Sequence, residues 1–426
     1  MKKMKHERCK KSKKQKDAAQ NPKIGEDFLT FLPSEIIINI LSSRLPIRTT
    51  MSCTAVCKPW LDLLRTPEFV KSHISKSVPG LAVFLEGEYA KPYKVFEYVD
   101  ELSNPKRRVP RWNMTLNFNL PIDKPPYSSV DGLLFLCTRG MMSREIFKSG
   151  IFRQEFIRWP RDLFICNPIT REYIKLPCPL EFSSSKSKVH MDTFGFGVSR
   201  TTGQYKLVRV FHEWILNKRL VLAELVEPKF QVYNVGSGLW SGIACVGPFK
   251  YEGNAKGAFL SGNIHWLVRD MYGSSVWISC FDLETEIFST FSPPPCRRDD
   301  REECLNVSTL RDCLCMCDNT AYDEIVIWLM RDYGDDKSWT KEFVIRKKDL
   351  DYNEGLMCPI KAFQNGDILM ALEYSKPLTL YFSSKTKTFR HVDLFGLQSC
   401  FCIRTVSYAP SFLPLKTLAV DNVSSF

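Results

Sequence analysis

Residues 257–268 (GAFLSGNIHWLV) and 278–291 (ISCFDLETEIFSTF) carry the two-part pattern that decides the fold. The first part is an apolar run that a turn at Gly262 divides, and the second is a strand, a polar turn and another strand. Short β-rich runs that turn residues interrupt are typical of antiparallel sheets. The stretch therefore predicts four short antiparallel strands.

The same pattern recurs along the chain after residue 76. Turn residues Gly262, Asp312 and Gly366 follow one another at intervals of about fifty residues, a period that suits kelch-type propeller blades. The chain from 76 to 415 is therefore predicted to be a kelch-like antiparallel β-propeller, with the number of blades left open. Further runs of the first kind occupy 130–136, 310–318 and 363–372, and further runs of the second kind occupy 164–177, 230–243, 325–345 and 378–394.

Residues 28–75 have a different, helical pattern. Pro33 suits a first helical turn, and Ile36, Ile37, Ile40 and Leu41 recur at the spacing of a helix face. A second helix is expected to begin at Pro46, and a third at Pro59. Three helices in fewer than fifty residues are predicted to leave apolar surface uncovered, because so small a core is hard to stabilise alone. The pattern implies a partner.

This segment resembles an F-box motif in the ordered set Leu32-Pro33, Glu35, Ile40-Leu41, Arg44-Leu45-Pro46, Val56-Cys57-Lys58, Trp60, Pro67, Phe69 and His73. The resemblance implies a three-helix bundle that binds a Skp-type adaptor and, through it, a cullin-RING ubiquitin ligase. Two departures from the usual motif are eleven residues between the two Leu-Pro pairs, where ten are usual, and Thr50, where leucine is common. The adaptor contacts that the resemblance implies are Leu32, Pro33, Ile36, Ile40, Leu41, Leu45, Pro46, Val56 and Trp60.

The second region is similar to the plant F-box-associated domain. The segments that carry the similarity are NPITREYIKLP (167–177), FGFG (194–197), YKLVRVF (205–211), GNIHWL (262–267) and SWTKEF (338–343). This resemblance implies that the propeller binds a target protein and that the chain is the substrate receptor of an SCF-type ubiquitin ligase. A propeller that binds a protein or glycan outside any ligase is the alternative, since fold does not determine function. The identity of the target stays open.

The cysteines and histidines of the chain do not form a recognisable catalytic or metal-binding pattern. Cys313, Cys315 and Cys317 alternate along one predicted strand, so we interpret them as buried core thiols rather than zinc ligands. Neither a histidine metal motif, a nucleophile elbow nor a phosphate loop occurs. We expect a non-catalytic adaptor subunit without a cofactor or metal.

Charge and composition suggest where the chain acts. Residues 1–17 hold nine of the 59 Lys and Arg residues and two of the 47 Asp and Glu residues, so the net charge of +12 is concentrated at the N-terminus. We predict a disordered basic tail over 1–27 and a flexible tail over 416–426. A nuclear-import signal and a solvated charge run both fit the basic segment. The expected location is nucleus or cytoplasm, with neither nucleic acid nor membrane as a partner.

The aromatic residues are predicted to fall into two groups, one in the core and one on the surface. Trp266 is expected in the core because it lies in an apolar strand pattern, and the same is expected of Trp339, which lies closer to a loop in SWTKEF. Aromatic residues in polar turns are candidates for the target-binding surface, because such side chains often dominate protein interfaces. These candidates are Trp112, Trp159, Trp214, Tyr272 and Tyr333.

Overall fold

The computed structural model describes most of the chain from Leu32 to Phe426. The described residues are 32–43, 45–86, 93–99, 111–120, 124–137, 143–148, 151–156, 162–179, 188–216, 222–225, 228–242, 244–251, 256–271, 275–295, 304–347, 356–373, 378–392, 402–419 and 422–426. The predicted basic tail lies outside these residues. Within them, no helix combines the length and the apolar composition of a membrane span.

Four α-helices open the described chain, whereas the sequence pattern predicted three. They are α1 (Ser34–Ser43), α2 (Ile47–Cys53), α3 (Lys58–Leu64) and α4 (Pro67–Lys76). The unpredicted helix, α4, begins with a regular capping signal, because the Thr66 hydroxyl accepts a hydrogen bond from the Phe69 backbone N–H and Pro67 occupies the first turn. The prediction was wrong because it treated the segment after α3 as a motif of single residues.

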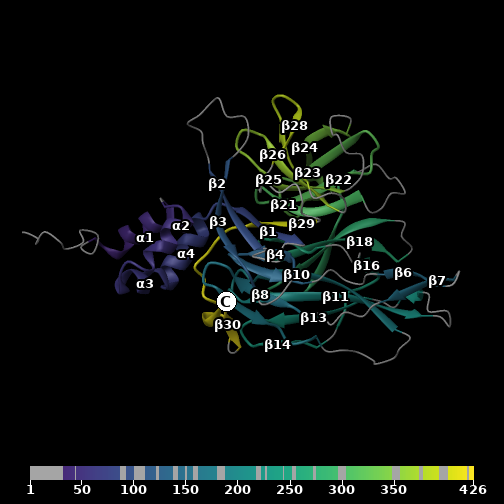
Figure 1. Ribbon diagram of the computed structural model, residues 1–426. Helices are drawn as coiled ribbons and strands as arrows, with labels where there is room; N and C mark the ends of the chain where they lie inside the picture. The colour runs from purple at the N-terminus through teal and green to yellow at the C-terminus, as the bar shows by residue number, and fades with distance from the viewer. Residues whose placement is uncertain are drawn as a thin grey trace, which may run out of the picture.

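All described strands except those of one separate hairpin form a six-bladed antiparallel β-propeller (Figure 1). Blade 1 contains β4 (Pro126–Val130), β5 (Leu133–Leu136), β8 (Phe164–Asn167), β9 (Glu172–Lys175) and β30 (Val423–Ser425). Blade 2 contains β10 (Lys188–Val198), β11 (Tyr205–Leu216), β12 (Leu222–Leu225), β13 (Lys229–Asn234), β14 (Leu239–Trp240) and β15 (Ala244–Cys245). Blade 3 contains β16 (Phe249–Tyr251), β17 (Ala258–Leu260), β18 (Asn263–Asp270), β19 (Val276–Asp282) and β20 (Phe288–Phe291).

The other three blades have four strands each. Blade 4 contains β21 (Leu305–Leu310), β22 (Cys313–Asp318), β23 (Glu324–Met330) and β24 (Trp339–Arg346). Blade 5 contains β25 (Leu356–Ala362), β26 (Ile368–Glu373), β27 (Leu378–Ser383) and β28 (Thr388–His391). Blade 6 contains β29 (Cys402–Tyr408), β1 (Gly80–Glu86), β2 (Tyr93–Val99) and β3 (Arg111–Phe118). A separate hairpin, β6 (Ser143–Lys148) and β7 (Ile151–Phe156), lies on the side away from the helices in Figure 1.

The propeller ring is closed by strands from opposite ends of the chain. The inner strands contact one another in the order β4, β10, β17, β21, β25 and β29, and β29 contacts β4 again. Strand β29 pairs with β1 over seven positions, from Gly80 opposite Tyr408 to Glu86 opposite Cys402. Blade 6 therefore exists only when both ends of the propeller region have come together.

Tight turns join the first two strands of several blades, as the repeat pattern predicted. Asp131-Gly132, Ser261-Gly262 and Arg311-Asp312 each form a two-residue loop in which both residues have positive φ. This conformation belongs to the type I′ turn, whose twist matches that of a β-hairpin. The apolar runs on either side of these turns are thus hairpin strands, and this interpretation is confirmed.

The core lies between neighbouring blades. Trp266 of blade 3 is fully buried and Trp339 of blade 4 is 8% exposed, so both burial predictions are confirmed. Blade 2 approaches blade 3 at Gly195, where a Cβ atom would lie 2.3 Å from Ile264 Cγ2 and 2.7 Å from Trp266 Cζ2. Glycine at this position permits the two sheets to pack closely.

The predicted core thiols are also found between blades. Cys315 and Cys317 are fully buried in the cluster that joins blades 4 and 5, and Cys313 packs against that cluster. Their interpretation as core residues is confirmed. Burial raises the pKa of the Cys315 thiol to about 12, which keeps the group protonated at neutral pH.

The prediction of a flexible tail over 416–426 was wrong for its described residues. A 3₁₀ helix covers Leu415–Thr417, and β30 pairs with β9 at the outer edge of blade 1. The ring of Phe426 stacks on Phe118, with 5.4 Å between centroids. The composition of this segment gave no sign of order, because its order depends on an edge strand formed more than two hundred residues earlier.

Candidate partner-binding surfaces

Helix α1 has two apolar faces, and this makes it unlike an ordinary surface helix. Ile37 and Leu41, four residues apart, point into the core of the helical segment. Ile36 and Ile40, also four residues apart, are 47% and 36% exposed. The first pair holds the helix in place, and the second pair is available to a partner.

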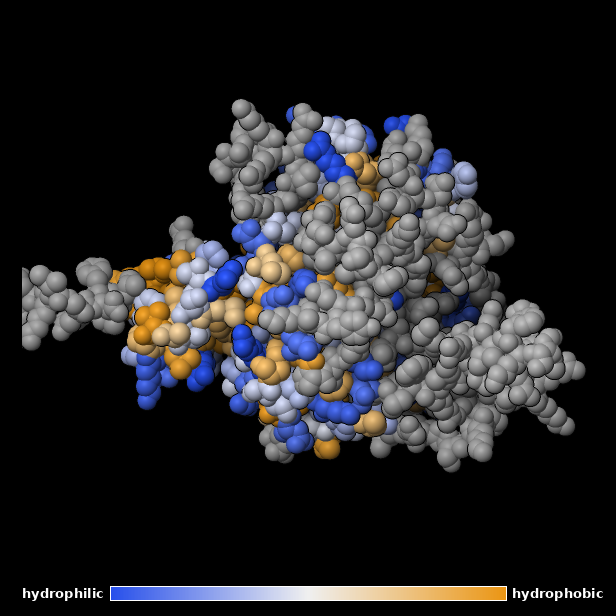
Figure 2. Space-filling model, viewed as in Figure 1, coloured by the Kyte–Doolittle hydropathy of each residue, from blue (hydrophilic) through white to orange (hydrophobic). Residues whose placement is uncertain are grey.

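The other predicted adaptor contacts are exposed to different degrees. Val56 is 55% exposed, Pro33 and Pro46 are exposed, and Leu32, Leu45 and Trp60 are half-buried. Figure 2 shows apolar residues gathered over the helices at the left of the molecule. Leu41 differs because it is 2% exposed, so we leave it out of the contact surface. We call Ile36, Ile40, Val56 and Pro46 the exposed apolar set.

Thr50 replaces the leucine that is common in this motif, and the structure shows how the exchange is accommodated. Its side chain is fully buried, and its hydroxyl donates to the Leu41 carbonyl oxygen over 3.2 Å. The hydroxyl therefore has a partner inside the core, as buried polar groups require. The substitution changes the interior of the helical segment and not the exposed apolar set.

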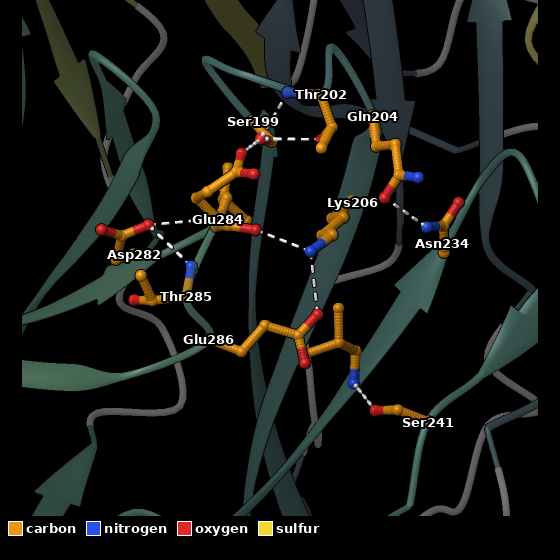
Figure 3. Close-up of polar contacts among 12 residues, drawn as sticks. Ser199, Thr202, Gln204, Lys206, Asn234, Ser241, Asp282, Glu284, Thr285 and Glu286 are labelled. Carbon is orange, nitrogen blue, oxygen red and sulfur yellow. Dashed lines mark hydrogen bonds and ion pairs between the residues drawn. The ribbon is translucent and has the colours of Figure 1, made fainter.

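Polar contacts between neighbouring blades link the turns on the propeller face that the helices touch, which we call the turn face. Between blades 2 and 3, Lys206 Nζ donates to the Leu283 carbonyl oxygen over 2.6 Å and to Glu286 Oε1 over 2.8 Å, and Ser199 donates to Glu284 (Figure 3). Similar contacts join Tyr205 to Asp131, Arg311 to the Phe363 carbonyl, Lys361 to the Pro79 carbonyl and Ser411 to the Asp131 carbonyl. The polar groups of the turn face thus serve mainly to hold blades together.

The structure separates the five predicted target-binding aromatics. Trp112 is half-buried and packs on Tyr98 in a core cluster between blades 5 and 6. Tyr333 is 42% exposed, but its hydroxyl is held by His265. Trp159 and Tyr272 lie outside the described residues, and Trp214 lies in β11 with a side chain that is not described. None of these observations tests target binding, which stays a prediction for these residues.

An aromatic residue that the sequence analysis missed is the most exposed large apolar side chain among the described residues. Tyr322 is 85% exposed and lies in the loop between β22 and β23. This loop joins the strand ends opposite the Arg311-Asp312 turn, so it lies on the face away from the helices, which we call the loop face. The signal was available, because Tyr322 stands in a polar segment, NTAYDE, between two apolar runs.

Buried side chains anchor the first residues of the Tyr322 loop. Asp318 Oδ1 accepts hydrogen bonds from the backbone N–H and the hydroxyl of Thr320, over 2.9 and 2.6 Å. Asn319 exchanges two hydrogen bonds of 3.1 Å with the Met357 backbone of blade 5. A rigid loop that presents an exposed aromatic ring loses little entropy when it binds.

Two buried histidines, His73 and His265, are uncharged because of their burial. Burial lowers the pKa values of His73 and His265 to about 4, so both imidazoles are neutral at physiological pH. In the part of the chain that the structure describes, no group of three or more His, Cys, Asp or Glu residues has the arrangement of a metal site.

Comparison with known proteins agrees with this two-part architecture. Residues 29–75 match a family model described as F-box-like, and residues 156–415 match a model described as the F-box associated beta propeller domain. The chain is 23% identical over 328 residues to the F-box protein CPR1 of Arabidopsis thaliana, covering 73% of this chain and 72% of that protein. It is 24% identical over 263 residues to the F-box protein DOR of the same plant, covering 61% and 60% of the two chains.

Proposed function

Because the chain belongs to the F-box-associated β-propeller family, we propose that it is the substrate receptor of an SCF-type (Skp–cullin–F-box) ubiquitin ligase. In this role the helices bind a Skp-type adaptor, the propeller binds a target protein, and the chain itself catalyses nothing. The observation that carries the proposal is the second apolar face of α1, which the propeller leaves exposed.

The exposed apolar set supports adaptor binding through ordinary burial energetics. Ile36, Ile40 and Val56 are each more than a third exposed although they are strongly apolar. Covering a large aliphatic side chain completely stabilises a complex by about 1.5–3 kcal/mol. Three such side chains on the helical segment give apolar surface that a groove of a partner helix bundle can cover.

The proposed role in ubiquitin transfer is to supply proximity. A receptor that holds a target beside a conjugating enzyme loaded with ubiquitin raises the effective concentration of the target's amino groups near the ubiquitin. Such a mechanism needs two binding surfaces and no acid, base or metal in the receptor. The exposed apolar set on the helices and the loop face of the propeller are separate surfaces of this kind.

For the target we propose the loop face, with Tyr322 as one contact. The turn face is partly covered by the helices, and its polar groups join neighbouring blades. Tyr322, by contrast, is exposed on the other side, in a loop whose first residues are anchored by hydrogen bonds. Tyrosine is enriched among the residues that dominate binding energy in interfaces, which supports this choice.

Calorimetric titration of the purified full chain with a Skp-type adaptor tests the proposal. The double variant Ile36→Ala, Ile40→Ala removes the exposed face of α1 and leaves Ile37 and Leu41 in the core. We expect its affinity to fall by about ten- to a hundredfold, which corresponds to roughly 1–3 kcal/mol of lost burial. Leu45 and Trp60 are less suitable, because they also pack against the core of the helices.

Ile287→Ala is the matched control, because Ile287 is 64% exposed on the propeller. It should bind the adaptor with unchanged affinity. If the unsubstituted chain binds no adaptor, or binds it without recruiting a cullin, the proposed role fails and a propeller scaffold outside any ligase becomes the better hypothesis.

A further inference from the structure

The contacts between the helices and the propeller point to a fixed joint. We propose that residues 409–419 and 422–426, which we call the C-terminal strap, lock the F-box helices onto blades 1 and 6. The helices then reach their adaptor-binding fold only with the strap in place, and the propeller holds its target in one orientation relative to the adaptor. This functional consequence rests on the proposed receptor role, whereas the joint itself does not.

The strap supplies part of the core of the helical segment. Phe412 is 6% exposed, and its ring lies edge-on to Phe69 of α4, with 5.5 Å between centroids and 67° between planes. The same ring meets the imidazole of His73 at 5.2 Å and 86°. Ile169, from the turn between β8 and β9, is buried in the same cluster. The helices are thus incomplete as an independent unit, because two propeller-region side chains fill their interior.

Buried polar side chains of blade 1 hold the strap in position. Asn167 is fully buried, and its Nδ2 donates to the carbonyl oxygens of Ser411 and Leu413 over 3.1 and 2.7 Å. Glu172 is 8% exposed, and its Oε2 accepts a hydrogen bond from the Leu415 N–H over 2.7 Å. These contacts fix the backbone on both sides of Phe412.

The strap also touches the helices and the turn of blade 1 directly. Ser77, just after α4, donates its hydroxyl to the Pro410 carbonyl oxygen over 3.0 Å. Ser411 donates to the Asp131 carbonyl oxygen over 2.5 Å, beside Gly132, where a Cβ atom would lie 2.6 Å from the Ser411 backbone nitrogen. The strap is therefore enclosed between α4 and the turn of blade 1.

A second contact, away from the strap, links α2 to blade 6. The N-cap residue of α2, Pro46, makes no capping side-chain hydrogen bond. Glu97 of strand β2 replaces it, because its Oε1 accepts a hydrogen bond from the Ile47 N–H over 3.0 Å. The hydroxyl of Thr115 donates to the other carboxylate oxygen over 2.9 Å. A carboxylate at a helix N-terminus satisfies an open N–H group and complements the helix dipole.

The end of the strap joins two blades. Strand β30 extends the outer edge of blade 1 by pairing with β9, and Phe426 stacks on Phe118 of blade 6. Figure 1 shows this chain, in yellow, passing from β29 beside α4 to the C-terminus at β30. The segment that completes the ring therefore continues without interruption into the segment that fixes the helices.

Hydrogen–deuterium exchange of the full chain tests the joint without reference to any partner. Phe412→Ala should increase exchange at least tenfold in α1 and α4, while blades 3 and 4 keep their protection. Phe382→Ala is the matched control, because Phe382 is 3% exposed in the cluster between blades 4 and 5. This control should loosen blade 5 and leave the helices protected. Equal protection of α1 and α4 in the Phe412→Ala variant and the unsubstituted chain would overturn the proposal.

The second contact offers a milder test if Phe412→Ala fails to fold. Glu97→Ala removes the acceptor for the Ile47 N–H, whereas Glu97→Gln keeps an oxygen at the same place. We expect about a threefold or larger increase in exchange within α2 for the alanine variant and a smaller change for glutamine. Exchange in α2 that is the same in both variants as in the unsubstituted chain would contradict the joint.

Adaptor titration of the same variants separates the joint from the receptor role. The alanine variants at 412 and 97 should lose at least fivefold in affinity, and Phe382→Ala should lose none. Loosened helices in a chain that never binds the adaptor would leave the joint supported and the receptor role refuted. Unchanged adaptor affinity despite loosened helices would refute the requirement of the strap for binding.

Discussion

The hydroxyl of Tyr333 lies 2.8 Å from Nε2 of His265 and connects blade 4 to blade 3. Nδ1 of the same imidazole lies 3.1 Å from the Ala258 carbonyl oxygen, which can only accept. Nδ1 therefore carries the proton, and Nε2 accepts the hydrogen bond from the tyrosine. This pairing requires a neutral imidazole, and burial favours the neutral form by lowering its pKa to about 4, although the bond to Ala258 acts in the opposite direction.

This lowered pKa predicts that stability falls in mild acid. The unfolded chain, with an imidazole pKa near 6.5, binds a proton that folded His265 does not bind until about pH 4. Protons therefore favour unfolding in this window, and the contribution is complete above pH 6.5 and lost as the pH falls toward 4. The loss from His265 should be roughly 3 kcal/mol at pH 4, and buried His73 acts in the same direction.

Urea unfolding at pH 7 and pH 5 measures this effect. His265→Gln removes the titrating group, so its stability should depend less on pH than that of the unsubstituted chain. Tyr333→Phe should keep the pH dependence of the imidazole and cost about 1 kcal/mol at neutral pH for the lost hydrogen bond. The same pH slope in His265→Gln and the unsubstituted chain would show that His265 is not responsible.

The packing of blade 2 on blade 3 predicts that two substitutions destabilise the protein for opposite reasons, one by leaving a cavity and one by overpacking. Trp266→Ala leaves a cavity in a fully buried site and should destabilise the protein by about 3–5 kcal/mol. Gly195→Ala adds a methyl group where none fits and should cost about 1–3 kcal/mol. Gly203→Ala is not a suitable control because Gly203 has positive φ, whereas Gly242→Ala is, since nothing lies near its Cβ position. If Gly195→Ala and Gly242→Ala have the same denaturant midpoint, the close packing inferred at Gly195 is contradicted.

Features that depend on neighbouring residues could be predicted from the sequence. The Asp131-Gly132 and Ser261-Gly262 turns were recognisable because a two-residue hairpin loop needs residues that tolerate positive φ. Exposed apolar surface on α1 could be expected because so small a bundle cannot cover it, but the pattern placed Ile36, Ile37, Ile40 and Leu41 on one face, whereas Ile36 and Ile40 lie on a second one. Burial of Trp266 followed from the apolar strand pattern around it.

Features that depend on distant residues were missed. Ring closure pairs β1 with β29, and the order of residues 422–426 depends on β9, so local composition could reveal neither. The hydrogen bond of Tyr333 depends in the same way on a residue of another blade, His265. The exposure of Tyr322 is different, because its polar segment was visible in the sequence.

Exposure of Tyr322 predicts a substitution that separates binding from stability. Tyr322→Ala removes a side chain that is 85% exposed, so the unfolding free energy should change by less than about 0.5 kcal/mol. If the loop face binds the target, the affinity for that target should fall by about 2 kcal/mol or more, as for other aromatic interface residues. Thermal unfolding and adaptor titration serve as controls, and both should match the unsubstituted chain.

The two proposed surfaces together predict how cellular targets can be recognised. Expression of the unsubstituted chain should increase ubiquitin-remnant peptides from a true target. The Ile36→Ala, Ile40→Ala variant still holds its target but recruits less adaptor. It should therefore compete for the target with the cell's own unsubstituted receptor and lower the amount of those remnant peptides. The Tyr322→Ala variant recruits adaptor without holding the target. The remnant peptides should therefore stay near their level in cells that express none of these chains. Quantitative proteomics of the three lines would therefore select proteins that rise in the first, fall in the second and stay level in the third. If remnant peptides respond alike to all three chains, the helices and the loop face do not have the separate roles assigned to them.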